Sequence, residues 1–109
     1  MKITKAMREG TDQVSYFDIL EQGKWWRTAD AVWVRVRDME VRHALFTLAL
    51  LERKADDLAT RYVFSPVFFD APDEVQAELD HIVDNPSRWI RSTEIYQSML
   101  QHVIKEALK

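Results

Sequence analysis

The stretch KWWRTADAVWVRVRDM, residues 24–39, alternates between apolar and charged or aromatic side chains before a helical pattern takes over. The alternating positions are Val32, Val34 and Val36 against Trp33, Arg35 and Arg37. Only a β-strand arranges a period of two as one apolar face and one polar face. Residues 24–28 can pair with this strand across a two-residue turn at Ala29-Asp30 or Asp30-Ala31. The sequence therefore predicts a β-hairpin.

The two faces of this hairpin follow from the turn length, because either two-residue turn opposes residues of the same parity. One face is predicted to hold Trp25, Arg27 and the three valines, and it is expected to pack on a helix, since a two-stranded ribbon is marginal alone. The other face would look outward as a candidate partner-binding surface made of Lys24, Trp26, Thr28, Trp33, Arg35 and Arg37.

The residues after the hairpin predict one long helix, with an N-cap at Asp38 and an end near Tyr62. Its first half is apolar nearly all round, because a second stripe of Met39, Phe46 and Leu50 accompanies the main core stripe. Such a helix is either central and covered on both sides, or it offers one stripe to another chain. Met39, Phe46 and Leu50 are therefore candidates for a self-interface.

The segment before the hairpin predicts a short helix, although its apolar residues would also suit a strand. Thr11 and Asp12 can cap such a helix, and Gly23 lies where a left-handed C-terminal residue belongs.

Residues 64–72, FSPVFFDAP, break the helical pattern and are apolar enough that we expect them to lie across the core. Asp70 and Pro72 then indicate the start of a helix that ends at Asn85-Pro86, and Ser92 is the expected cap of the last helix. The predicted fold is α+β and mainly α. It consists of one β-hairpin packed on a long central helix, with two or three further helices, in a single domain spanning residues 1–109.

Composition narrows the classes of function. The chain has 109 residues, 47% of them hydrophobic and 30% charged, which is typical of one globular domain. It has no cysteine and no long apolar run, so we expect neither disulfides nor a membrane span, and a cytoplasmic location fits. The net charge of -3 means that binding to nucleic acid would need a local basic patch.

Catalytic signatures are weak. Glu78 and His81 form one Glu-x-x-His pair, but a di-metal site of that kind needs a second copy and further carboxylates. His43, His81 and His102 lack metal-binding spacing, and two glycines cannot supply a phosphate-binding loop. We therefore expect no enzymatic activity, no metal and no cofactor.

Residues 26–53 resemble a pattern found in small proteins of tailed bacteriophages and prophages. That pattern reads W-x-T-x-D-G, a short gap, I-x-I-x-x-M, three residues, and H-L-x-N-x-I-x-x-L-E-R. This chain has WRTADA, then VRVRDM, then HALFTLALLER, with Ala31 in place of the turn glycine and Phe46 in place of the asparagine. The resemblance implies a phage context rather than a mechanism.

Together these observations predict a small non-enzymatic phage protein that binds and modulates or inhibits a bacterial host protein, in host takeover or in defeat of a host defence. Tryptophan and arginine are the residues most enriched where protein contacts carry their energy. Two alternatives use the same residues differently: a nucleic-acid-associated accessory factor on the Trp/Arg face, and a homo-oligomeric structural protein, such as a homodimer through the helix stripe.

Overall fold

The computed structural model describes residues 16–109. Along this part of the chain the elements are α2 (Tyr16–Leu20), β1 (Trp25–Arg27), β2 (Trp33–Arg35), a 3-10 turn η1 (Val36–Asp38), α3 (Val41–Arg53), α4 (Ala55–Val63), a second 3-10 turn η2 (Pro66–Phe68), α5 (Asp73–Asp84), α6 (Pro86–Ser92) and α7 (Glu94–Ala107). The described part therefore has six α-helices and one antiparallel hairpin, which confirms the α+β, mainly α fold. The proposed caps Thr11 and Asp12 lie outside the described residues.

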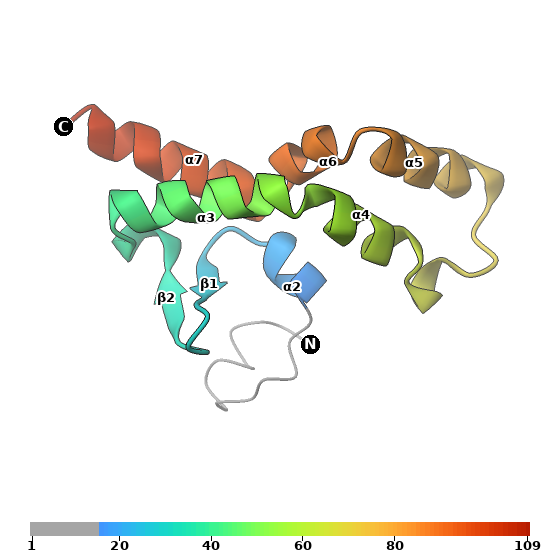
Figure 1. Ribbon diagram of the computed structural model, residues 1–109, viewed down its shortest axis with the longest axis horizontal. Helices are drawn as coiled ribbons and strands as arrows, with labels where there is room; N and C mark the ends of the chain where they lie inside the picture. The colour runs from blue at the N-terminus through green and yellow to red at the C-terminus, as the bar shows by residue number, and fades with distance from the viewer. Residues whose placement is uncertain (1–15) are drawn as a thin grey trace.

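The core lies where α3 and α7 run side by side (Figure 1). The short helix α2 and the turn η1 pack against α7, whereas α4 packs against α5 and α6. One cluster of buried side chains connects the N-terminal elements to α3, α4, α6 and α7. Its members are Ile19, Leu20, Trp26, Val36, Met39, Ala44, Leu48, Leu51, Ala55, Leu58, Ile90, Ile95, Tyr96 and Met99.

The hairpin forms as predicted, but its loop has three residues instead of two. Trp26 pairs with Val34, and the Thr28 and Val32 backbones are joined by a hydrogen bond of 2.9 Å, so residues 29–31 form the loop. Ala31 takes a left-handed conformation with φ of 60°, as the third residue of such loops commonly does. An odd loop length reverses which residues share a face.

The predicted faces are therefore wrong for the whole first strand, because Lys24, Trp26 and Thr28 lie opposite the valines and Trp25 and Arg27 lie opposite Arg35 and Trp33. Trp26 lies on the valine face and is 6% exposed, while Trp25 lies on the other face with Arg35. The valine face itself is graded along the strand, because Val36 is buried, Val34 is half-buried and Val32, beside the loop, is exposed.

The single long helix expected from Asp38 to Tyr62 is two helices. Asp38 belongs to η1 instead of capping a helix, and α3 begins after Glu40, whose side chain makes no capping hydrogen bond. The helix breaks at Lys54, which has φ of -94° and ψ of 3°. The break is accounted for by packing, because α3 lies along α7 whereas α4 bends away toward α5 and α6 (Figure 1).

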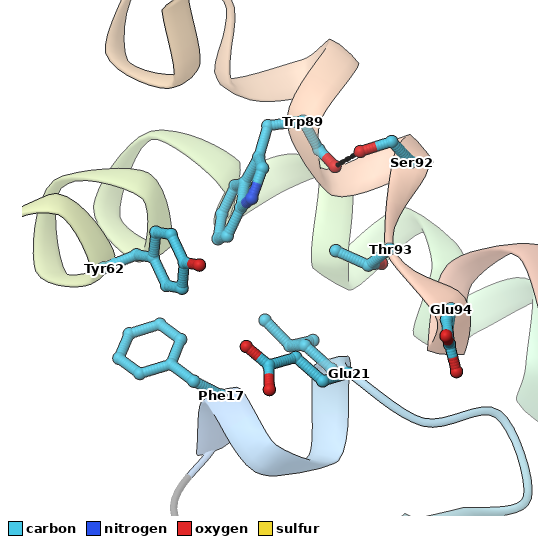
Figure 2. A pocket seen from close by; sticks show the side chains of 8 residues that line it. Phe17, Glu21, Tyr62, Trp89, Ser92, Thr93 and Glu94 are labelled. Atoms are coloured by element: carbon cyan, nitrogen blue, oxygen red, sulfur yellow. Dashed lines mark hydrogen bonds between the residues drawn. The ribbon is translucent and has the colours of Figure 1, made fainter. Parts of the chain in front are cut away.

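An aromatic cluster around Tyr62 joins α2, α4, η2 and α6, and Figure 2 shows its members Phe17, Tyr62 and Trp89. The Tyr62 ring meets Phe17 edge-on at 5.4 Å between centroids, Phe68 edge-on at 5.1 Å and Trp89 in a tilted arrangement at 5.2 Å. Such arrangements stabilise beyond the buried area alone.

Only Phe68 of the apolar segment 64–72 joins that cluster. Phe64, Val67 and Phe69 are each more than two-thirds exposed, so the expectation that this segment lies across the core is wrong. The physical reason is that Tyr62 and Trp89 already cover this end of α4, and a single ring from η2 completes the packing.

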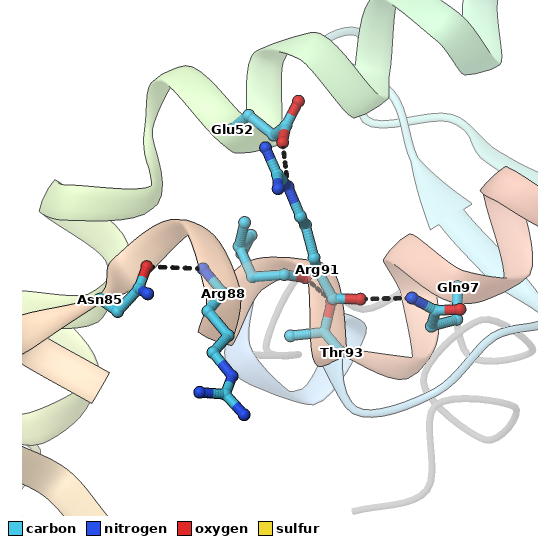
Figure 3. Close-up of polar contacts among 7 residues, drawn as sticks. Glu52, Asn85, Arg88, Arg91, Thr93 and Gln97 are labelled. Carbon is cyan, nitrogen blue, oxygen red and sulfur yellow. Dashed lines mark hydrogen bonds and ion pairs between the residues drawn. The ribbon is translucent and has the colours of Figure 1, made fainter. Parts of the chain in front are cut away.

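Side-chain caps define the two C-terminal helices (Figure 3). Asn85 Oδ1 accepts a hydrogen bond from the Arg88 backbone at 3.2 Å, so the predicted stop at Asn85-Pro86 is also the start of α6. Thr93, rather than the expected Ser92, caps α7 by accepting from Tyr96 N at 3.4 Å. The Ser92 hydroxyl instead donates to Trp89 O, because Ser92 still belongs to α6.

An ion pair ties α6 to α3. Arg91 Nε lies 2.5 Å from Glu52 Oε1, and the same contact appears in Figure 3. Hydrogen bonding to Glu52 is the main cause that raises the pKa of Arg91. Arg91 is largely exposed and Glu52 is about one-third exposed, so the pair contributes little to stability.

Candidate functional site

A groove of about 900 Å³ separates the base of the hairpin from the C-terminal half of α7. One wall comes from the start of β1, the end of β2 and η1, and the other comes from a single face of α7. The lining residues are Gly23, Lys24, Trp25, Arg35, Val36, Arg37, Ser98, Gln101, His102, Lys105, Glu106 and Lys109. We call it the basic groove.

Two contacts between backbone and side chain hold the walls of the basic groove together. The Ser98 hydroxyl donates to the carbonyl of Gly23, and His102 Nε2 lies 2.8 Å from the carbonyl oxygen of Met39. Since a carbonyl only accepts, Nε2 of His102 carries the proton. The two contacts join the chain before and after the hairpin to the same helix.

Gly23 is needed for this close approach. A Cβ placed on it would lie 2.9 Å from Ser98 Cβ and 3.3 Å from Glu94 O. The left-handed helix end predicted for Gly23 is wrong, because its φ is not in the left-handed range. The absence of a side chain, rather than a special backbone angle, is what the position requires.

Gln22 fixes the residues that enter the groove. Its side-chain oxygen accepts from the backbone N–H groups of Lys24 at 2.9 Å and Trp25 at 2.8 Å. Its side-chain nitrogen donates to Ile19 O at 2.7 Å and Trp25 O at 2.6 Å. One amide therefore closes the turn between α2 and β1 and positions Lys24 and Trp25.

The groove is strongly positive although the chain has a net charge of -3. Among the described residues that line it, five are cationic and one is acidic: Lys24, Arg35, Arg37, Lys105 and Lys109 against Glu106. Lys109 Nζ lies 2.9 Å from Glu106 Oε1, and this hydrogen bond is the main cause that lowers the Glu106 pKa. Lys105 also contributes to the lowered pKa of Glu106, whereas Lys24, Arg35 and Arg37 make no ion pair among the described residues.

Direct cross-strand pairs organise the outer face of the hairpin. Trp25 pairs with Arg35, whose guanidinium lies 5.0 Å from the indole centroid, and Arg27 pairs with Trp33 at 5.7 Å. Each pair is a cation–π contact within the usual 6 Å range. These contacts hold Arg35 over Trp25 at the edge of the basic groove.

The predicted partner-binding residues divide into two groups. Lys24, Arg35 and Arg37 come together in the basic groove, as one surface, but Trp26 is buried beneath the hairpin. Trp33 is half-buried, packs against the edge of the core and does not line the groove. Trp25 takes the place predicted for Trp26, because the three-residue loop exchanges their faces.

Sequence reasoning missed the wall supplied by α7. Ser98, Gln101, His102, Lys105 and Lys109 recur at spacings of three and four, which places them on one face of a helix. This polar stripe was a usable signal, but the sequence alone did not indicate that the stripe faces the hairpin.

The predicted self-interface is also divided. Met39 is only 6% exposed and belongs to the core, so it cannot contribute to a surface contact. Phe46 is 61% exposed, its neighbour Leu45 is 50% exposed, and Leu50 is half-buried. Met39 precedes α3 and points into the core because the η1 turn separates it from the helical stripe.

Across residues 16–109 no group of three or more histidine, aspartate or glutamate side chains is placed to hold a metal ion. No helix in that range is both long and apolar enough to cross a membrane. Comparison of the chain with protein-family models, with curated proteins and with solved structures yields no match.

Proposed function

We propose that this chain is a binding protein without chemistry of its own, and that its basic groove holds an acidic segment of a partner protein. The observation that supports this proposal is that five cations, one indole and only one carboxylate line the groove among the described residues, in an otherwise acidic chain. A local positive field within a negative surface selects acidic segments and orients them on approach.

The shape of the groove favours an extended segment over a compact metabolite. The groove has a volume of about 900 Å³ and lies between a hairpin and a helix. Its cations are spread along both walls instead of converging on one point, as they would for a single phosphate. Several carboxylates spaced along a peptide match that distribution.

Nucleic acid is the less favoured ligand. Non-specific binding of single strands relies on several aromatic rings that stack on successive bases. Trp25 is the one aromatic ring among the described residues of the lining, and Arg35 already lies over it. The acidic remainder of the chain would also repel a polyanion at long range.

The likeness of residues 26–53 to small phage proteins supports a bacterial host protein as the partner. In this proposal the chain acts in the cytoplasm of the infected cell, where it blocks or redirects a host enzyme or a defence protein. Stoichiometric binding through one well-formed surface suits a protein of this size.

A pair of charge-matched variants tests the groove. Arg35→Gln with Lys105→Gln removes two groove cations, and Arg42→Gln with Arg53→Gln removes two exposed cations of α3 outside it. We expect the first pair to weaken binding of a fluorescent Glu/Asp-rich peptide about two- to thirtyfold, since each exposed ion pair contributes about 0.2–1 kcal/mol. The second pair should change affinity less than twofold.

Equal losses of peptide affinity in the two double variants would refute the basic groove as the binding site, because the affinity would then depend on total charge alone. A single-stranded oligonucleotide of equal charge is the second probe. Tighter binding of the oligonucleotide, with an affinity that falls log-linearly with salt, would favour the nucleic-acid alternative. Capture from bacterial lysate with nuclease, using the parent chain and the groove variant, would then identify a partner that depends on the groove.

Self-association is a second candidate function, and one observation favours it. Leu45 and Phe46 are adjacent and at least half exposed on α3, which is unusual for large apolar side chains in a monomer. Light scattering at high concentration should give a dimer mass that Phe46→Ser lowers to the monomer mass. A monomer mass for the parent chain would remove this alternative.

A further inference from the structure

A second cavity, of about 270 Å³, shares no lining residue with the basic groove and lies between α2, α4 and the junction of α6 with α7. Figure 2 shows the rings of Phe17, Tyr62 and Trp89 around it. Tyr62 contacts each of the other two rings, at 5.4 Å and 5.2 Å between centroids. The three rings therefore form a continuous aromatic wall contributed by three helices.

The charge of this cavity is opposite to that of the basic groove. Its charged lining residues are Glu21 and Glu94, and none of the described residues that line it is cationic. Neither carboxylate has an ion-pair partner among residues 16–109. In Figure 2 the Glu21 carboxylate lies beside the space between Phe17 and Tyr62.

The N-terminus of α7 carries a partial positive charge that would repel a cation in the cavity. This charge is smaller than the negative charge of the two carboxylates. A helix N-terminus is equivalent to about half an elementary charge. Two carboxylates outweigh it, and Glu94 itself belongs to the first turn of α7. The net field in the cavity is negative.

The volume of the cavity limits the size of the ligand that it can hold. Pockets for drug-sized ligands are usually about 300–1,000 Å³, so a cavity of about 270 Å³ suits one small group and not a nucleotide or a sugar chain. An aromatic wall combined with a negative field is the environment that recognises an alkylated ammonium, because the ring faces attract the cation and its methyl groups pack on them.

We propose that this acidic aromatic cavity binds an alkylated ammonium group. Phe17, Tyr62 and Trp89 contact the methyl groups, and Glu21 supplies the nearest full negative charge. The site is separate from the basic groove and does not depend on what the groove binds. The same chemistry occurs on a free quaternary ammonium and on a methylated lysine side chain.

Titration of the full chain with tetramethylammonium chloride tests this proposal directly. The indole N–H resonance of Trp89 should shift with a dissociation constant of about 0.1–10 mM, a range reasonable for so small a ligand. The other three tryptophans lie outside the cavity and their indole resonances should stay in place. Choline and its neutral isostere 3,3-dimethylbutan-1-ol form a matched pair, and choline should bind at least fivefold more tightly.

Variants separate charge from shape. Glu21→Gln keeps the size of the side chain and should weaken tetramethylammonium binding about two- to fivefold, whereas Glu78→Gln, an exposed carboxylate on α5, should leave it unchanged. Trp89→Leu, which lacks the reporting indole and is followed through the backbone amide resonances of the residues that line the cavity, should abolish binding in a protein whose circular dichroism still reports a folded chain. Phe17→Leu provides the same readout if the Trp89 variant does not fold.

A peptide carrying trimethyllysine distinguishes the two sources of the ammonium group. Tighter binding of this peptide than of tetramethylammonium would identify a protein side chain as the ligand, and equal binding would identify a free cation. Equal affinity for choline and its neutral isostere, or a Glu21→Gln effect no larger than that of Glu78→Gln, would overturn the proposal.

Discussion

The contact between Gly23 and Ser98 allows a stability measurement whose sign can be predicted. Gly23 has no unusual backbone angle, so alanine there would by itself stabilise the protein by about 0.4–1 kcal/mol through a more restricted unfolded chain. The added Cβ, however, would lie 2.9 Å from Ser98 Cβ, and such overpacking costs about 1–3 kcal/mol. Gly23→Ala should therefore destabilise the parent chain by about 1–2 kcal/mol.

The sign should change when Ser98 is replaced. Ser98→Gly removes the atom that the new Cβ meets, leaving Glu94 O at 3.3 Å as the nearest remaining neighbour. In that background Gly23→Ala should be neutral or stabilising. The hydrogen bond from Ser98 to Gly23 is absent from both members of this second pair, so its loss cancels in the comparison.

Urea denaturation of the four proteins, followed by circular dichroism, measures the coupling free energy. We expect about 1–3 kcal/mol, well above the 0.3–0.5 kcal/mol within which independent sites add. A coupling below about 0.5 kcal/mol would refute the close approach of the hairpin to α7, and with it the closed end of the basic groove.

Three further results are expected. Trp26→Ala should lower the free energy of unfolding by about 3–5 kcal/mol in urea denaturation, because this indole is 6% exposed, whereas Arg35→Ala should lower it by no more than about 1 kcal/mol; similar losses would contradict the three-residue loop. Thr93→Ala should cost about 1 kcal/mol and Ser92→Ala less than about 0.5 kcal/mol, and the reverse order would restore Ser92 as the cap of α7. Burial, and secondarily Glu21, raises the pKa of Tyr62 above its usual value of 10.0, so the folded state holds this proton more tightly than the unfolded state. The stability that Tyr62 contributes should be complete below pH 10 and be lost as the pH rises through the pKa of Tyr62 in the folded protein. Tyr62→Phe should flatten that part of the pH profile of stability measured by denaturation. An unchanged profile would contradict the raised pKa of Tyr62.

The sequence was sufficient to predict the two strands of the hairpin but not which residues share a face. The period of two at residues 32–37 was sufficient to predict a strand, and the partner strand followed from the short spacing. The faces could not be derived, because they depend on whether the loop has two or three residues. Ala31 carries no sign of its left-handed conformation, since glycine or asparagine is the usual signal for it.

The basic groove could be predicted only in part, because one of its walls also depends on tertiary packing. Lys24, Arg35 and Arg37 were identified from local spacing along the hairpin. Lys105 and Lys109 lie some 70 residues later in the chain, and only the packing of η1 against α7 brings them opposite. The break at Lys54 is likewise a tertiary effect, because the apolar pattern continues through it without a glycine or a proline.

The three-residue loop also determines which changes this hairpin could survive during evolution. A substitution at positions 29–31 alters exposed side chains and leaves the alternation of the strands intact. A single-residue deletion or insertion would change the parity and exchange Trp25 with Trp26, placing Arg27 on the valine face against the core while Arg35 stays on the outer face. Related chains should therefore vary freely at positions 29 and 30 and favour glycine or asparagine at position 31, while length changes that persist should come in steps of two.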